Sequence, residues 1–378
     1  MSMAKPTPTV LLNDFRAQWR DIRSDAIAAL ERVGESGWLI LGDEVRTFEE
    51  QLARFWDAKH AVGCANGLDA LEIALRVLGL RPGDKVLTTP LSAFATTLAI
   101  VRAGGVPVFV DIDESGLIDL SSCAAALERH RDMRHFVPVH LYGHAVDAAE
   151  LERLRSHYDL ALVEDCAQAI GAKSGNRPVG TTGQIAATSF YPTKNLGAMG
   201  DGGALLCSDD ALAETARTLR DYGQSSKYVH SRLGMNSRLD ELQAAIMRSA
   251  LLPRLSDATA RRRVIAQRYR DGIHNTAVRV VPTPANSASV WHLFPVRIAA
   301  DRDGFRAHLQ KHGVASGIHY PQTIPDQPAL ADVPNALIVG DLTHACAFAR
   351  EEVSLPMHPY LTDAEVDVVI KACNTWRP

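Results

Sequence analysis

The sequence predicts an α/β protein with a mixed, mostly parallel sheet and a smaller second module. Between residues 60 and 210, short apolar runs alternate with amphipathic segments of helical spacing. This alternation favours a sheet with helices on both faces. A chain of 378 residues with 46% hydrophobic composition also has enough apolar surface for a large core. We therefore expect a large domain over residues 1–250, including a helical N-terminal segment, and a small C-terminal α+β domain over 251–378.

The expected large domain reads as strands and helices in turn. Its first 60 residues have a helical pattern interrupted by glycines. Runs rich in β-branched and aromatic residues predict strands, namely VLTTP (86–90), VPVFVDI (106–112), HFVPVH (135–140), LALVED (160–165), ATSFY (187–191) and GALLC (203–207). Helical spacing predicts three helices between them, namely ALEIALRVL (70–78), AAALERH (124–130) and AELERLRSH (149–157).

A long helical region and a short α+β pattern complete the chain. Residues 239–275 are rich in Arg and Ala and predict helix. After two prolines, VWHLFPVRI (290–298) predicts a strand and GFRAHLQKH (304–312) a helix. A closing helix begins at TDAE (362–365), whose Thr and Glu form the sequence pattern of a capping box.

Bulk composition excludes several classes of function. The 40 basic and 44 acidic residues give a net charge of −4, which does not favour general binding to nucleic acid or anionic membrane. The six cysteines have no CxxC spacing, so we expect neither a disulfide framework nor a metal site. The N-terminal MSMAKPTPTV lacks the apolar run of a signal peptide, and no segment reaches membrane-spanning length. We expect a cytoplasmic protein.

Lys194 is the first candidate for chemistry. It lies in SFYPTKNLGAMGDGGAL (189–205), where its neighbours are aromatic, small or glycine. A lysine amine becomes a nucleophile, or holds a carbonyl as a Schiff base, when its surroundings lower its pKa. The competing interpretation is a surface lysine in a turn, which is the commoner case for a lone lysine. The other candidates decide between the two.

Asp165 ends the apolar strand in LVEDCAQAIGA (162–172), where open α/β sheets place groups that contact ligands. A buried carboxylate needs a partner, and a protonated pyridine nitrogen would serve. At about 4 Å and an effective dielectric near 20, such a pair gains roughly 4 kcal/mol of attraction. A helix N-cap is the competing interpretation. Gln168 lies one turn further on and could donate to a ring oxygen or be an ordinary helix residue.

A third candidate is the turn in GCANGLDALEIAL (63–75), where a strand-like entry meets a helix at Asn66–Gly67. Helix N-termini present unpaired N–H groups and bind phosphate without basic side chains. Gly67 would allow close backbone approach, although most Asn–Gly turns are plain turns. The Ser189 hydroxyl could add to the same phosphate. A ring nitrogen, a phosphate and a carbonyl-capturing lysine together describe pyridoxal 5′-phosphate.

The order of motifs resembles that of the DegT/DnrJ/EryC1/StrS family. The motifs are NGLDAL, VEDCAQAIGA, SFYPTKNLGAMGDGGAL and LGMNSRLDELQAAI, and further similar stretches such as VPVHLYG (137–143), IHYP (318–321) and VSLPMHPYLT (353–362) extend the resemblance over nearly the whole chain. Members are fold-type I, pyridoxal-phosphate-dependent aminotransferases that act mostly on nucleotide-linked keto-sugars. The resemblance implies a three-layer large domain. The motifs NGLDAL and NSRLDELQAAI most resemble those of the branch that makes 3-amino-3,6-dideoxyhexoses on dTDP.

The resemblance assigns roles around the cofactor ring and the phosphate. It implies that Lys194 forms the Schiff base and later moves the proton. Asp165 pairs with the pyridine nitrogen, and Gln168 contacts the phenolic oxygen. The phosphate is held by the Ser189 hydroxyl and by the backbone of Gly67, Leu68 and Asp69. Asn236 is expected to reach the phosphate of the neighbouring subunit, which implies a homodimer with composite active sites.

The resemblance also suggests where the substrate binds. The candidates for contacts with the sugar nucleotide are Tyr191, Arg238, His319 and Tyr320. Arg238, expected to act from the neighbouring subunit, has a competing interpretation as a helix-surface partner of Asp240 or Glu241. His319 and Tyr320 have one as loop residues packed under the small domain.

Two positions depart from the family pattern. Leu68 stands where the family often has a threonine, so a hydroxyl contact to phosphate is missing. Ala93 stands where the family often has an aromatic residue stacked on the pyridine ring. Either Phe94 takes that role through a local shift, or something smaller covers the ring.

The reaction implied is transfer of an amino group from an amino acid, with glutamate expected, to a ketone on the sugar of a nucleotide-linked substrate. We lean towards dTDP-3-keto-6-deoxyhexose. Amination at C4, and an amino-cyclitol or aminobenzoate-type relative, remain open. A dehydratase of the same family is disfavoured because Lys194 is present. An alternative of another class is a non-catalytic regulatory protein with this fold.

Overall fold

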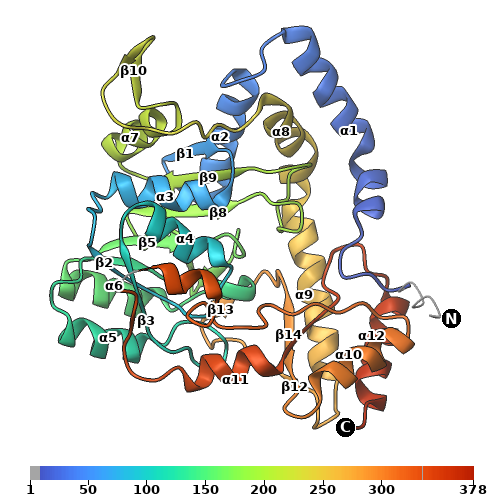
Figure 1. The fold of residues 1–378 in the computed structure, drawn as a ribbon. Helices are drawn as coiled ribbons and strands as arrows, with labels where there is room; N and C mark the ends of the chain where they lie inside the picture. The colour runs from blue at the N-terminus through green and yellow to red at the C-terminus, as the bar shows by residue number, and fades with distance from the viewer. Residues whose placement is uncertain (1–8, 334) are drawn as a thin grey trace.

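A computed structural model describes residues 9–333 and 335–378 (Figure 1). The N-terminal residues 1–8, where we expect no signal peptide, lie outside the described residues. The main feature of the described residues is an eight-stranded sheet in the order β1-β9-β8-β5-β4-β2-β3-β15. The strands are β1 (His60–Cys64), β2 (Lys85–Thr88), β3 (Val106–Phe109), β4 (His135–Val137), β5 (Ala161–Asp165), β8 (Ile185–Ser189), β9 (Gly203–Cys207) and β15 (Leu337–Ile338). Only β9 runs antiparallel to its neighbours β1 and β8, so the prediction of a mixed, mostly parallel sheet is confirmed.

Helices cover both faces of this sheet. They are α1 (Phe15–Ser36), α2 (Asp43–Trp56), α3 (Gly67–Val77), α4 (Phe94–Arg102), α5 (Leu120–Arg129), α6 (Ala148–Tyr158), α7 (Asp210–Arg220) and α8 (Glu241–Ile246). Successive residues of one strand enter different cores: Ala61 and Ala186 pack with α2 and α8, whereas Val62 and Ala187 pack with α3, α4 and α7. Because strand side chains alternate between faces, the two cores lie on opposite sides and the domain has three layers.

Short polar side chains begin four of the helices that follow strands, although α4, which begins after Ala93, has no such cap. Asn66, Asp119, Asp147 and Asp209 each accept a hydrogen bond from a backbone N–H in the first turn of α3, α5, α6 or α7. Such a cap satisfies N–H groups that have no partner within the helix. The predicted helices are confirmed, but α3 begins at Gly67, three residues earlier than the apolar spacing indicates.

A second, three-stranded antiparallel sheet lies in the C-terminal part. It contains β12 (Arg279–Val280), β14 (Phe294–Arg297) and β16 (Glu352–Leu355). Helices α9 (Leu255–Gly272), α10 (Arg302–Lys311) and α12 (Asp363–Thr375) surround it and share its core. The predicted capping box at Thr362 and Glu365 is confirmed at the start of α12.

The helical region 239–275 is confirmed but is not one regular helix. Between α8 and α9 the chain passes through a π-helical turn η2 (Met247–Leu251) and a 3-10 turn η3 (Leu252–Arg254). The turn contains Pro253, whose missing N–H prevents regular α-helical bonding there. The predicted domain boundary at 250 falls within this irregular stretch and stays a prediction. β15, although within 251–378, pairs with β3 at the edge of the large sheet.

Several predicted strands are longer than the observed ones. The run 106–112 forms a strand only as far as Phe109, and the run 290–298 only over β14. In the second case Trp291 has a positive φ of 49°, which breaks the extended backbone.

The remaining elements are short: β6 (Lys173–Ser174), β7 (Arg177–Pro178), β10 (Gln224–Ser226), β11 (Val229–His230), β13 (Ser287–Ala288), η1 (Leu141–Gly143), η4 (Pro328–Asp332) and α11 (Thr343–Glu351). Among the described residues, no helix is both long enough and apolar enough to cross a membrane.

Helix α2 is capped by a residue almost 200 positions away. Its N-cap residue, Gly42, supplies no side chain. Instead the buried Glu241 carboxylate accepts hydrogen bonds from the N–H groups of Gly42, Glu44 and Val45 at 2.8, 2.9 and 2.8 Å. The charge also complements the positive end of the α2 dipole. Glu241 therefore joins α8 to α2.

We predict that Glu241→Ala lowers the free energy of unfolding by about 2–3 kcal/mol, because three buried N–H groups lose a charged acceptor. Urea denaturation measures this change. Glu50→Ala is the matched control, since Glu50 pairs only with the exposed Arg46 and such pairs contribute less than about 1 kcal/mol. Equal effects of the two variants would contradict this role of Glu241.

Candidate active site

A cavity of about 380 Å³ opens where strands β5 and β8 end and helix α3 begins. Most of the predicted site residues line it: Gly67, Leu68, Asp165, Gln168, Ser189, Tyr191, Lys194, His319 and Tyr320. They come from segments far apart in the sequence. The cavity therefore brings together the lysine, the carboxylate and the helix start that the sequence analysis singled out separately.

Lys194 enters this cavity from the turn after β8. Its backbone N–H donates to the carbonyl of Tyr191 at 2.8 Å, which holds the turn. Its amine has no ion pair or hydrogen bond with any residue that the structure describes. Burial lowers the Lys194 pKa to about 8, against the opposing effect of the Asp165 carboxylate. An amine with this pKa is partly neutral, and so nucleophilic, near physiological pH.

Asp165 faces the same cavity from the end of β5 and is 4% exposed. One carboxylate oxygen accepts from the Thr96 hydroxyl at 2.9 Å, and the other accepts from the Ala167 N–H at 3.1 Å. Burial raises its pKa, whereas Ala167, Thr96 and the charge of Lys194 act to lower it. No cation lies within ion-pair distance among the described residues. Asp165 is thus a buried carboxylate that still lacks a cationic partner.

The start of α3 forms the opposite end of the site. The Asn66 side chain accepts from the N–H of Asp69 at 2.8 Å, which leaves the N–H groups of Gly67 and Leu68 without a partner inside the helix. A β-carbon on Gly67 would lie 2.6 Å from the β-carbon of Ser189, so only glycine fits here. This helix start beside a hydroxyl is suited to an anion such as phosphate.

Gln168 is held by two tyrosines. Its side-chain oxygen accepts from the N–H of Tyr142 at 2.7 Å, and its amide nitrogen donates to the Tyr320 hydroxyl at 3.3 Å. These bonds orient the amide, and one of its N–H groups remains for a ligand. Burial raises the pKa of Tyr320 above its usual value, so its phenol stays neutral and is both a donor and an acceptor in the cavity.

Three of the predicted residues do not line the cavity. Asp69 is the third residue of α3, and the Ser237 hydroxyl donates to its carboxylate at 2.8 Å. Its N–H is already bonded to Asn66, so the structure gives it no free donor for phosphate. Asn236 is exposed, and its role concerns a second subunit and stays a prediction.

Arg238 has a partner that the sequence did not indicate. Its guanidinium donates to Asp221 at 3.0 Å and lies 5.2 Å from the ring centre of Tyr222. The competing interpretation, a pair with Asp240 or Glu241, is wrong, because Arg238 pairs with Asp221 and Glu241 caps α2. A substrate contact from Arg238 stays a prediction.

The structure decides whether Phe94 or a smaller residue lines the cavity at the expected position of the ring-stacking aromatic. Ala93 lines the cavity, whereas Phe94 packs against the cluster of Phe109, Ile324 and Leu330. Phe94 is the first residue of α4 and does not line the cavity. No local shift brings Phe94 into the cavity, so a smaller group than an aromatic ring lines this position.

Several lining residues were not predicted: Leu12, Asn13, Thr96, His292, Leu293 and Met357. His292 is the most notable, because its Nδ1 lies 3.2 Å from the side-chain oxygen of Asn195, the neighbour of Lys194. Asn195 donates its amide N–H to the carbonyl of Val290 at 3.0 Å, so its oxygen faces His292 and the imidazole Nδ1 is the donor. Burial holds the His292 pKa well below its usual value. A histidine inside the apolar run 290–298 was the one available sequence signal.

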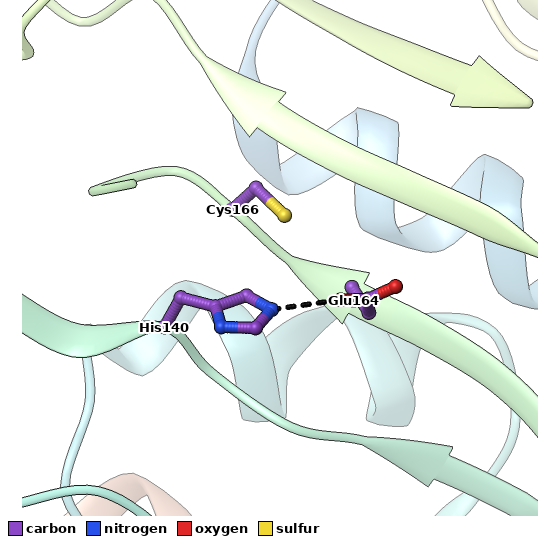
Figure 2. Close-up of side chains that lie close together, drawn as sticks. All are labelled: His140, Glu164 and Cys166. Carbon is purple, nitrogen blue, oxygen red and sulfur yellow. Dashed lines mark hydrogen bonds and ion pairs between the residues drawn. The ribbon is translucent and has the colours of Figure 1, made fainter. Parts of the chain in front are cut away.

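Figure 2 shows a buried group of His140, Glu164 and Cys166, of which the last two flank Asp165 in the sequence. Glu164 accepts from His140 Nε2 at 2.9 Å and from the N–H groups of Gly180, Thr182 and Gly183 at 2.9, 2.7 and 2.6 Å. Burial opposes its ionisation, but the hydrogen bonds from His140 and the loop outweigh it and lower its pKa.

The other nitrogen of His140 is also engaged. Its Nδ1 accepts from the N–H of Val146 at 3.0 Å, so the imidazole carries its proton on Nε2 and donates to Glu164. Because the ligand atoms of His140 and Glu164 are occupied by hydrogen bonds, we interpret the group as an anchor for the end of β5. It holds Asp165 in place rather than binding a metal.

Comparisons with known proteins agree with this site. The model of the DegT/DnrJ/EryC1/StrS aminotransferase family matches residues 20–374. A dTDP-3-amino-3,4,6-trideoxy-alpha-D-glucose transaminase of Streptomyces venezuelae is 40% identical over 100% of this chain and 98% of its own length. A pleiotropic regulatory protein of Geobacillus stearothermophilus is also 40% identical, over 95% of this chain and 96% of its own.

Solved structures give the same result. DesV from S. venezuelae, in complex with a ketimine intermediate, has a TM-score of 0.92 at 40% identity and covers 98% of this chain and 99% of its own. NtdA from Bacillus subtilis, with bound cofactor PMP, has a TM-score of 0.87 at 27% identity and covers 98% of this chain and 85% of its own. The predicted fold class is confirmed, and the chain belongs to the DegT/DnrJ/EryC1/StrS aminotransferase family.

Proposed function

We propose that this aminotransferase uses pyridoxal 5′-phosphate to move an amino group from an amino acid, with glutamate as the donor, to a ketone on a nucleotide-linked deoxy sugar. The preferred substrate is a dTDP-3-keto-6-deoxyhexose. The single observation that carries the proposal is that Lys194 and Asp165 face one cavity without pairing with each other. The transaminase from S. venezuelae, a relative named for a dTDP-3-amino sugar, supports the substrate class.

The chemistry of the cavity residues fits this cofactor. Asp165 is a buried carboxylate in need of a cation, and a protonated ring nitrogen is one. The unpaired N–H groups at the start of α3, with Ser189, suit its phosphate. Lys194 supplies the amine that captures its aldehyde. The PMP found in NtdA of B. subtilis, a relative by fold and sequence, supports this choice.

The cofactor, when bound, supplies an aldehyde that accepts an amine and a ring that withdraws electrons from the adjacent carbon. The chain supplies the rest. Asp165 keeps positive charge on the ring nitrogen, and Thr96 holds the Asp165 carboxylate in place. Lys194, with its pKa lowered to about 8, accepts a proton from the substrate carbon or donates one to it. Gly67, Leu68 and Ser189 orient the phosphate end.

We also propose a homodimer with composite sites. Large apolar side chains are exposed near the cavity mouth and on the hairpin of β10 and β11, which projects at the top of Figure 1. Leu233 is 92% exposed, Tyr228 81%, Tyr191 53% and Met199 52%. Exposed large apolar side chains of this kind support an interaction surface here. Asn236 follows this hairpin in the chain, and its exposure supports a contact with a partner subunit.

The alternatives differ in what they require of the cavity. A regulatory role without catalysis, which the name of the Geobacillus relative raises, requires neither a lowered Lys194 pKa nor an unpaired buried carboxylate. Both features destabilise a protein that does not use them. We therefore favour catalysis. Amination at C4 and action on a cyclitol or aminobenzoate-type ring share this cavity and are separated by the next experiment.

We predict that the protein with pyridoxal phosphate and glutamate aminates a dTDP-3-keto-6-deoxyhexose in preference to other substrates. The measurement is product identification by mass spectrometry and NMR over a panel of dTDP-, UDP- and GDP-linked 3-keto and 4-keto sugars. A product aminated at C4 would replace the proposed position. If no keto-sugar is aminated with any of several amino donors, the proposed activity is wrong.

Lys194 is predicted to be the residue that captures the aldehyde. After addition of pyridoxal phosphate and borohydride, peptide mass spectrometry should find the label on Lys194 and lose it in Lys194→Ala. Because the free amine has a pKa of about 8, the capture rate of the cofactor-free protein should fall about tenfold per pH unit below pH 8. Lys173→Ala, at an exposed lysine, is the matched control. Equal labelling of Lys194→Ala and wild type would rule out this assignment.

Composite sites predict complementation between two inactive variants. A mixed dimer of Lys194→Ala and Asn236→Ala has one site with both residues intact. If subunits exchange at random, half of the dimers are mixed and each restores one site of two, so the mixture should recover about a quarter of wild-type activity. The measurement is steady-state amination after co-refolding or co-expression. Recovery no greater than that of either variant alone would argue that Asn236 serves its own subunit.

A further inference from the structure

His319 is fixed in the cavity wall on every side but one. Its backbone N–H donates to Glu352 Oε2 at 2.6 Å, its carbonyl accepts from the Tyr142 hydroxyl, and its ring Nδ1 lies 2.9 Å from Ser354 Oγ. Nε2 has no partner among residues 9–333 and 335–378, and His319 lines the cavity. Nε2 is therefore the ring nitrogen left for a ligand.

The contact with Ser354 continues into the protein. Ser354 Oγ lies 2.5 Å from Glu352 Oε1. Glu352 and Ser354 are two residues apart on β16 and so share one face of the strand. Both are 0% exposed, and Glu352 forms no ion pair with any described residue. A hydrogen-bonded relay thus runs from a fully buried carboxylate through a hydroxyl to the cavity.

The protonation state of Glu352 fixes which nitrogen of His319 carries the proton, because Ser354 has only one hydrogen to donate. Glu352 Oε2 accepts the His319 N–H, so a neutral Glu352 carries its proton on Oε1 and donates to Ser354. Ser354 has one hydrogen, which it then donates to His319 Nδ1. A neutral imidazole must in that case carry its proton on Nε2 and be a donor towards the cavity. When Glu352 is ionised, Ser354 donates to Glu352, His319 Nδ1 donates to Ser354, and Nε2 becomes an acceptor.

Both states lie within a practical pH range. Burial raises the Glu352 pKa to about 8, although Ser354, the His319 N–H, Arg302 and Arg306 act to lower it. Burial and the charge of Lys194 lower the His319 pKa to about 4, so the imidazole is neutral throughout. The titratable and charged groups that face the relay are Arg302 and Arg306 of α10, Tyr142 of η1, Tyr320, His292 and, across the cavity, Lys194.

We propose that Glu352 is a positioning residue which, through Ser354, decides whether His319 donates a hydrogen bond to the bound keto-sugar or accepts one. This rests on the proposed function. With Glu352 neutral, His319 Nε2–H donates to a ketone or hydroxyl oxygen of the sugar. With Glu352 ionised, Nε2 presents a lone pair, which repels a ketone oxygen.

The switch conserves protons. As Glu352 ionises, its proton passes to Ser354 Oγ and the serine hydrogen passes to His319 Nδ1. The Nε2 proton leaves to water in the cavity, so the relay releases one proton and no other bond changes. The sign follows directly: binding that needs the donor form is complete below pH 8 and is lost as pH rises through it.

Glu352→Gln tests the relay. The His319 N–H must face the amide oxygen of Gln, so the amide NH2 faces Ser354 and donates at every pH. Nitrogen-15 NMR of histidine side chains in the full-length protein distinguishes the tautomers, with His319→Gln used to assign the signal. We expect the wild type to change from the Nε2–H to the Nδ1–H tautomer between pH 6.5 and 9.5, and Glu352→Gln to keep Nε2–H at both. The change must persist in Lys194→Ala, which removes the other nearby group that titrates near pH 8.

Kinetics supply the second measurement. KM for the keto-sugar should rise about tenfold in the wild type from pH 7 to 9.5, the effect of losing one hydrogen bond, but not in Glu352→Gln. Ser354→Ala, which breaks the relay, should also lose this pH dependence. A wild-type tautomer that does not change, or changes equally in Glu352→Gln or only when Lys194 is present, would overturn the proposal. If no keto-sugar is aminated, the proposed function fails while the NMR result still decides the relay.

Discussion

The site depends on an attraction between two partly or fully buried opposite charges that face one cavity and are not in contact. The Asp165 carboxylate raises the pKa of the Lys194 amine, while burial lowers it, and the balance lies near 8. If the two groups touched, the pair would neutralise itself and the lysine would stay protonated. Their separation leaves a space in which a group with a cationic end and an aldehyde end is stabilised by both residues. Much of the surrounding structure serves to maintain that separation.

On the Asp165 side, the support comes from the residue before it. Glu164 and Asp165 are consecutive on β5, so their side chains point to opposite faces of the sheet. Glu164 accepts hydrogen bonds from His140 and from the loop 180–183, as Figure 2 shows for His140. The two carboxylates have different environments as a result. Glu164 is well solvated by fixed donors and has a lowered pKa, whereas Asp165 has fewer donors and a raised one.

The remaining wall of the cavity comes from the C-terminal part of the chain. His292, His319 and Tyr320 lie on segments that join or flank the small antiparallel sheet. Glu352 and Ser354 lie within that sheet and contact the cavity only through His319. The end of the site that holds Lys194 and Asp165 is therefore built on the large sheet, and the wall with His319 and Tyr320 is built on segments beside the small one. A change in the small sheet can alter substrate binding without touching Lys194.

The sequence by itself was sufficient for the α/β class, for most strands and helices, and for singling out Lys194, Asp165 and Gly67, which the structure brings to one cavity. Each of these follows from local signals, such as apolar periodicity, a carboxylate at a strand end and a glycine at a helix start. It was not sufficient for Thr96, His292 or the relay of Glu352 and Ser354, and it gave the wrong alternative partners for Arg238. Hydrogen-bond partners and burial depend on which distant segments meet, and the pKa of a group depends on both. Only the tertiary structure decided these partners, burials and pKa values, because it brings distant segments together and removes water between them.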